Sequence, residues 1–173
     1  MKDFTRLFDI IHYQNAKYPK SDCYGYKANG QWLKVSTAEV LEKANKVSLS
    51  LLKLGVKPGD KIAIVSNNRP EWNETDLGIL QTGAINVPVY PTISEGEYKF
   101  IFNDAEIKYA FVSDAKLCAK IKAIKNDVPS LQDIFSFDKV DSCRSFDEFL
   151  TYGKDGSLPL GNFSGISGSL VCT

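Results

Sequence analysis

Residues 61–89, KIAIVSNNRPEWNETDLGILQTGAINVPV, decide the fold because two apolar runs flank a helical stretch. The runs Ile62–Val65 and Ile85–Val89 predict buried strands bounded by polar residues. Pro70 predicts the first turn of the intervening helix, where the missing N–H of proline costs no hydrogen bond. Strands that alternate with helices pair in parallel through right-handed crossovers. This stretch therefore predicts an α/β fold, with a mostly parallel sheet flanked by helices.

Local sequence signals extend this pattern on both sides. Ser36–Glu39 and Ser94–Glu97 have the spacing of capping boxes, in which a serine and a glutamate satisfy the first free amides of a helix. Asn29-Gly30 predicts the tight turn of a short antiparallel hairpin near the start of the chain. The other expected elements are a helix over 4–18, hairpin strands at 24–28 and 31–35, strands at 109–112 and 131–137, and helices capped by Asp114 and Ser145.

The domain organisation follows from length and composition. The chain has 173 residues, which is enough for one domain with a buried core. We expect residues 1–152 to form this domain, because apolar periodicity runs through them. Residues 153–173 are rich in glycine and serine and have no clear period, so they predict a flexible tail. Ser164–Ser169 could cradle a phosphate, but no lysine or helix follows, and we interpret this stretch as part of the tail.

The charge balance excludes some classes of partner. The chain carries 21 basic and 21 acidic residues, so no overall field attracts nucleic acid or an anionic membrane surface. No apolar run approaches the ~20 residues that a membrane-spanning helix needs. Residues 1–6 lead directly into amphipathic sequence and do not resemble a signal peptide. We therefore expect a cytoplasmic protein without a transmembrane segment.

The cysteines give no motif. They lie far apart and form no C-x-x-C pair: Cys23, Cys118, Cys143 and Cys172. This spacing disfavours a zinc site and a redox motif. We predict that all four are reduced thiols.

Three stretches carry a family resemblance, and their order and spacing matter more than any one of them. They are LGVKPGDKIAI at 54–64, SNNRPEW at 66–72 and GAINVPVYPT at 83–92. Together they resemble the adenylate-forming acyl-CoA synthetases, and the second and third resemble the long-chain fatty-acid branch in particular. The similarity extends over about residues 4–152. It implies the N-terminal subdomain of the acyl-CoA synthetase-like fold.

The resemblance implies a two-step reaction in the full-length enzyme. A fatty-acid carboxylate attacks ATP with the help of Mg²⁺ to give an acyl-adenylate and pyrophosphate, and coenzyme A then displaces AMP. In this family a loop rich in Ser, Thr and Gly, closing with Pro-Lys-Gly, stabilises the phosphate charge. The sequence reaches Thr173 without this loop or the family's catalytic lysine. We therefore expect a fragment that is inactive alone, with no catalytic residue, metal ligand or cofactor of its own.

Four residues are candidates for ligand contact. Tyr90, Pro91 and Thr92 follow a predicted strand, and the resemblance places the matching segment beside the channel for coenzyme A or its pantetheine arm. Arg69 lies where a strand gives way to a helix, in the kind of crevice where open α/β sheets bind ligands. The structural alternatives are a rigid loop restricted by its prolines and, for Arg69, an ion pair with a neighbouring carboxylate while Trp72 packs in the core.

Other polar residues have weaker functional interpretations. Lys116 and Lys120 could meet coenzyme A phosphates, or they could belong with Lys122 and Lys125 to the solvated face of a helix. His12 is the only histidine, and it lies on a predicted surface helix without a Ser or Cys partner. We therefore expect no catalytic role for it.

Two alternative functions stay open. The chain could be a folded interaction or dimerisation module, including a homodimer, that uses apolar surface. It could also be the matching fragment of another adenylate-forming enzyme, such as a luciferase, a peptide-synthetase adenylation domain or a short-chain ligase. A free nucleotide-binding domain is disfavoured because the sequence has neither G-x-G-x-x-G nor a P-loop lysine.

Overall fold

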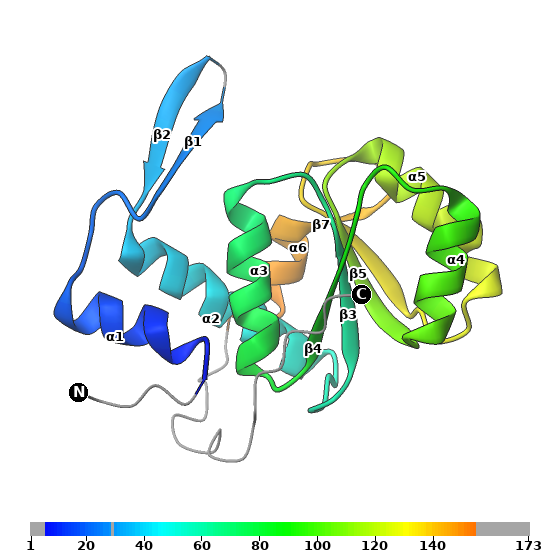
Figure 1. The fold of residues 1–173 in the computed structure, drawn as a ribbon, viewed down its shortest axis with the longest axis horizontal. Coiled ribbons are helices and arrows are strands. Elements are labelled where there is room, and N and C mark those ends of the chain that lie inside the picture. Colours follow the sequence, from blue (N-terminus) through cyan, green and yellow to red (C-terminus); the bar gives the residue numbers. More distant parts are fainter. Residues whose placement is uncertain (1–5, 29, 155–173) are drawn as a thin grey trace.

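A five-stranded parallel sheet forms the centre of the protein, in the order β4-β3-β5-β6-β7 (Figure 1). The computed structural model describes residues 6–28 and 30–154. β4 and β7 are the edge strands, and β7 has only two residues. The strands are β3 Lys61–Val65, β4 Ile85–Val89, β5 Ile107–Val112, β6 Asp133–Ser136 and β7 Arg144–Ser145. This sheet confirms the predicted α/β fold.

Helices cover both faces of the sheet. Figure 1 shows α2, α3 and α6 on one face and α4 and α5 on the other. The described helices are α1 Asp9–Lys17, α2 Thr37–Lys53, α3 Pro70–Gln81, α4 Glu95–Asp104, α5 Ala115–Ile124 and α6 Phe146–Thr151, with a 3₁₀ turn at Lys125–Asp127. Alternation along β3 separates two cores, because Ile62 and Ile64 face α2 and α3 while Ala63 and Val65 face α4 and α5. No described helix is both long enough and apolar enough to cross a bilayer.

Five phenylalanines dominate the core under α6. Phe111 on β5 and Phe135 on β6 are fully buried, and Phe149 on α6 lies with its ring centroid 5.0 Å and 4.8 Å from theirs. Phe137 and Phe146 complete the cluster, with centroids 5.0 Å apart. Edge-to-face and tilted contacts of this kind favour aromatic packing beyond the area that they bury. The cluster fixes α6, the last described helix, onto the sheet.

The helix starts agree closely with the sequence signals. Both capping boxes form, because Ser36 and Ser94 accept bonds from the Glu39 and Glu97 amides while each glutamate bonds back. Asp114 caps α5 and Ser145 caps α6, as predicted. The opening helix begins later than predicted, at Asp9, and Phe4 lies outside the described residues. The strand predicted at 131–137 is shorter, and β7 was missed because two residues carry no alternating pattern.

The predicted hairpin forms a separate two-stranded sheet. β1 Tyr24–Ala28 pairs antiparallel with β2 Gln31–Val35, and the ribbon projects from the body of the molecule (Figure 1). Gly30 has a φ of 78°, a conformation that glycine adopts without strain. At the base of the ribbon, Val35 packs with Ile11 of α1 and Val40 of α2 in a small third core.

Helices α2 and α3 approach each other very closely at Gly78. A Cβ atom on Gly78 would lie 2.4 Å from Val47 Cγ1 and 2.9 Å from the Ala44 carbonyl oxygen. The buried Ser48 hydroxyl lies at the same crossing, 2.9 Å from both the Ala44 and the Gly78 carbonyl oxygens. The crossing therefore requires the smallest residue on α3.

The prediction of four reduced thiols is wrong for two of the cysteines. Cys118 of α5 and Cys143, in the turn before β7, form a disulfide with their Cα atoms 6.4 Å apart. The sequence could not show this, because the fold brings together residues that are 25 positions apart. Cys23 is free, and Cys172 lies outside the described residues.

The predicted tail is described only at its beginning. Gly153 is buried against α2, where an added Cβ would lie 2.7 Å from Leu49 Cβ. This glycine therefore belongs to the packed domain. Residues 155–173, including Ser164–Ser169, lie outside the described residues.

Candidate functional site

The carboxyl ends of the parallel strands meet along one edge of the sheet, where open α/β folds bind ligands. β3 ends at Val65 and leads through 66–69 into α3. Its neighbour β4 ends at Val89 and leads into Tyr90–Thr92. The fold therefore brings two of the stretches that carry the family resemblance to the same edge.

A groove of about 490 Å³ lies between these two connections. Its lining consists of residues 66–68, Trp72 and residues 88–92. Tyr90 stands at the groove with 77% of its surface exposed, and the Tyr98 hydroxyl donates a 2.9 Å hydrogen bond to the Tyr90 carbonyl oxygen. Three of the four predicted contact residues, Tyr90, Pro91 and Thr92, thus share one apolar groove with an aromatic wall.

Arg69 has a different environment. Its guanidinium donates to Glu71 at 2.9 Å and to Asp138 at 3.0 Å, and also bonds the Ser113 carbonyl oxygen at 3.2 Å. It also lies over the Phe137 ring, 5.2 Å from the centroid. Burial opposes the charge of Arg69, but its bonds to the two carboxylates outweigh burial and raise its pKa. These contacts match the structural alternative, in which Arg69 pairs with a neighbouring carboxylate.

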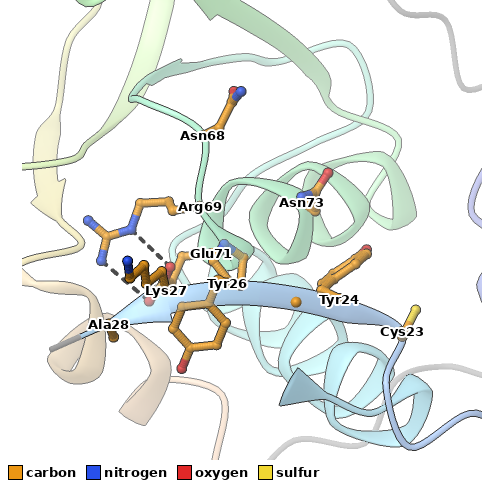
Figure 2. A pocket seen from close by; sticks show the side chains of 11 residues that line it. Cys23, Tyr24, Tyr26, Lys27, Ala28, Asn68, Arg69, Glu71 and Asn73 are labelled. Carbon is orange, nitrogen blue, oxygen red and sulfur yellow. Dashed lines mark hydrogen bonds and ion pairs between the residues drawn. The ribbon is translucent and has the colours of Figure 1, made fainter. Parts of the chain in front are cut away.

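A second hollow, of about 690 Å³, lies between the hairpin and the start of α3 (Figure 2). Residues 23–28 of the hairpin line one side, and residues 68–71 with Asn73 line the other. Arg69 therefore borders this hollow, while Tyr90 borders the groove, and Asn68 borders both. Burial, and then the charges of Cys23, Glu74 and Asp76, raise the pKa of Tyr24 to about 12, so its hydroxyl stays neutral.

Two residues that shape this edge of the sheet were not predicted from the sequence. Asn68 joins the two hollows, and Asp138 holds Arg69 from the loop after β6. A signal for Asn68 was present, because it lies inside the SNNRPEW stretch. No local signal indicated Asp138, because it lies 69 residues from Arg69 in the sequence. Trp72, predicted in the core, is half-buried and contacts the core while it also lines the groove.

The remaining candidates do not line the groove. Lys116 is exposed. Lys120 is half-buried and donates to the Ile93 carbonyl oxygen at 3.0 Å, so it is less solvated than predicted. His12 is half-buried on α1, and burial lowers its pKa, which favours the neutral ring. Within 6–28 and 30–154, no three His, Cys, Asp or Glu side chains gather as metal ligands would.

Glu74 on α3 is a fully buried carboxylate close to this edge. Lys43 Nζ lies 3.2 Å from Glu74 Oε1, an ion-pair distance, but neither carboxylate oxygen accepts a hydrogen bond of good geometry within the described part of the chain. Burial raises the pKa of Glu74 and outweighs the Lys43 charge, which lowers it. Burial also raises the pKa of Asp76, although Asn86 donates to it at 2.7 Å.

We expect Glu74→Gln to stabilise the protein above neutral pH. A carboxyl whose pKa is raised by folding contributes stability below its unfolded pKa, and this contribution is lost as the pH rises through the folded pKa. Removing the charge should therefore raise the free energy of unfolding by about 1 kcal/mol at pH 8 and leave it nearly unchanged at pH 4.5. Urea denaturation of the unchanged protein and the variant at both pH values measures this difference. Asp76, whose pKa burial also raises, is present in both proteins. A variant that is less stable at pH 8 would show that the Lys43 pair outweighs burial.

The parallel sheet with a groove at its carboxyl edge is the arrangement in which open α/β folds bind ligands. The family model described as "AMP-binding enzyme" matches residues 11–152, and the chain belongs to this family. Together with the relatives described next, this match confirms the predicted resemblance to acyl-CoA synthetases.

Curated relatives make the likeness more specific. The chain is 31% identical over 106 residues to long-chain-fatty-acid–CoA ligase FadD15 of Mycobacterium bovis, a match that covers 61% of this chain and 18% of the relative. It is 32% identical over 104 residues to long-chain-fatty-acid–CoA ligase heimdall of Drosophila melanogaster, covering 60% and 15%. These matches span less than a fifth of the relatives' length.

Solved structures share the fold. The anthranilate CoA ligase AuaEII in complex with anthranoyl-AMP superposes with a TM-score of 0.73 at 21% identity, covering 87% of this chain and 28% of that one. The A-PCP didomain of carboxylic acid reductase from Segniliparus rugosus, in complex with AMP, gives 0.74 at 16% identity, covering 92% and 28%. The predicted N-terminal portion of an acyl-CoA synthetase-like fold agrees with both.

Proposed function

We propose that this chain is the N-terminal portion of an AMP-forming long-chain fatty-acid–CoA ligase. The full-length enzyme joins a fatty acid to coenzyme A through an acyl-adenylate, with ATP and Mg²⁺ as in the family that the sequence resembles. The named relatives support the fatty-acid class of substrate. The cytoplasmic location stays a prediction from the sequence.

The groove between the connections that follow β3 and β4 is the observation that carries this proposal. Its wall of Trp72 and Tyr90 suits a narrow, flexible chain, because aromatic faces contact methylene groups well. The exposed amides of Asn67 and Asn68 can bond the amide groups of such a chain. A pantetheine arm has both features, and the groove therefore forms part of its channel.

Adenylation requires parts that this chain does not carry. A triphosphate needs a loop of amides, basic side chains and a metal to stabilise its charge. The sequence has no Ser/Thr/Gly loop closing with Pro-Lys-Gly. We therefore propose that the 173-residue chain shows no fatty-acid-dependent ATP–pyrophosphate exchange. Measurable exchange would place the essential groups within it.

Tryptophan fluorescence tests the groove directly. The chain has two tryptophans, so Trp32→Phe leaves Trp72 as a reporter in the groove wall. We expect pantetheine to change the Trp72 emission in a saturable way. Tyr90→Ala should weaken this binding about fivefold, since a stacked aromatic contributes on the order of 1 kcal/mol.

Phe100→Ala is the matched control for Tyr90→Ala. Phe100 lies on α4, is 70% exposed and does not line the groove, so its removal should leave the binding unchanged. An emission that responds to fatty acid but not to pantetheine would assign the groove to the acyl chain and overturn the pantetheine assignment. No response to either ligand would overturn the groove as a binding site.

The exposed aromatics also support the alternative of an interaction module. Trp32 on β2 and Phe100 on α4 are 74% and 70% exposed. Such residues favour association when they form part of a larger apolar surface. Sedimentation of the chain separates the two functions, because self-association without pantetheine binding would favour the module, including a homodimer.

A further inference from the structure

The Cys118–Cys143 disulfide has one buried and one accessible end. Cys118 lies on the inner face of α5 with 0% of its surface exposed, among the apolar side chains between α5 and the sheet. Cys143 is half-buried, in the turn that leads into β7. An external thiol must reach one of the two sulfur atoms before it can exchange with the disulfide. Cys143 is accessible from solvent and Cys118 is not.

A surface cavity of about 450 Å³ reaches the accessible end. Cys143 lines this cavity, whereas Cys118 does not. Lys122, Lys125 and Arg144 line it as well, together with three acidic side chains. Nearby cations stabilise a thiolate, which is the form of a thiol that attacks a disulfide. The cavity is therefore wide enough for a small thiol, and its three cations are balanced by three carboxylates.

The bond also anchors the loop between β6 and β7. At one end of this loop Asp138 pairs with Arg69, and at the other the Ser142 carbonyl oxygen accepts a hydrogen bond from Lys122. The Cys118–Cys143 bond is the covalent link between the loop and α5. Opening it would leave the loop attached to α5 only through non-covalent contacts.

We propose that the Cys118–Cys143 disulfide is a thiol-exchange site, which small monothiols open at Cys143 through this cavity. The sulfur of an incoming thiolate bonds to Cys143 Sγ as the disulfide breaks, and the electron pair leaves on Cys118 Sγ, which takes up a proton from water. A second thiolate then attacks the external sulfur of this mixed disulfide, and Cys143 Sγ leaves as a thiolate that takes up a proton from water. The products are an external disulfide and two cysteine thiols, a two-electron reduction of the protein by two monothiol molecules.

The burial of Cys118 gives the exchange a direction. An apolar environment disfavours a thiolate, so Cys118 stays a protonated thiol and attacks the mixed disulfide on Cys143 only slowly. Cys118 itself reacts with an external thiol only when the structure opens locally. The mixed disulfide should therefore form on Cys143 alone.

Peptide mapping of the full chain tests the direction. The protein is incubated with glutathione, its free thiols are alkylated, and the peptides are identified by mass spectrometry. We expect glutathione on Cys143 and alkylation on Cys118. Glutathione on Cys118 of the folded chain would overturn the proposal, and so would two free thiols at these positions after oxidation in air.

Single-cysteine variants give a second readout. In a Cys23→Ser, Cys172→Ser background, Cys118→Ala leaves only Cys143 and Cys143→Ala leaves only Cys118. With 5,5′-dithiobis(2-nitrobenzoate) we expect Cys143 to react about a hundredfold faster, since the buried thiol must wait for local opening. Circular dichroism confirms that both variants are folded. Equal rates in folded variants would overturn the assignment of Cys143 as the accessible end.

Discussion

Replacing Phe111 by alanine is expected to lower the free energy of unfolding by about 3–5 kcal/mol. Phe111 is fully buried and contacts four other phenylalanine rings, including Phe149 of α6 at 5.0 Å and Phe135 of β6 at 5.5 Å between centroids. The truncation removes these contacts and leaves a cavity that the sheet cannot close. Small domains are stable by only about 5–15 kcal/mol, so the loss is a large fraction of the total.

Urea denaturation, followed by circular dichroism, measures the effect of Phe111→Ala. Phe100→Ala is again the control, because an exposed side chain contributes within about 0.5 kcal/mol. Equal losses in the two variants would mean that the phenylalanine cluster does not form the core described here.

Gly78→Ala should lower the free energy of unfolding by about 2–3 kcal/mol, although alanine favours helix formation. The added methyl group would lie 2.4 Å from Val47 Cγ1 and 2.9 Å from the Ala44 carbonyl oxygen, so α2 and α3 must separate. Neither atom can move easily, because Val47 is buried and the carbonyl belongs to a helix backbone.

The control for Gly78→Ala is Gly96→Ala on α4. Gly96 is also helical, but among the described residues an added Cβ there would meet only the Ser94 hydroxyl oxygen, at 4.0 Å. The same substitution should therefore raise the free energy of unfolding there by about 0.5–1 kcal/mol. Thermal unfolding of both variants checks the opposite signs. Stabilisation by Gly78→Ala would show that the two helices are not in close contact.

Local signals predicted much of the fold. The two capping boxes, the Pro70 helix start and the hairpin about Gly30 each depend on residues within a few positions of one another. The parallel sheet followed from the alternation of strands and helices. In contrast, β7 was not predictable, because Arg144–Ser145 joins the sheet through pairing with β6 and not through its own composition.

The candidate site was predictable in part. Tyr90, Pro91 and Thr92 were found because they follow a strand directly, and the structure places them in one groove. The position of Arg69 beside a different hollow depends on Asp138, a partner that only the tertiary fold supplies. The disulfide was not predicted for the same reason. Cys118 on α5 and Cys143 before β7 are 25 residues apart, and only the tertiary fold brings them together.

The two outer strands of the central sheet also affect how the protein behaves at high concentration. A free strand edge can recruit the same edge of another molecule and begin a fibril. β4 contains Pro88, which has no N–H to donate to a strand of another molecule, and β7 is only two residues long. Neither edge strand offers a long, uninterrupted row of free backbone groups. The sheet is therefore protected against edge-to-edge aggregation.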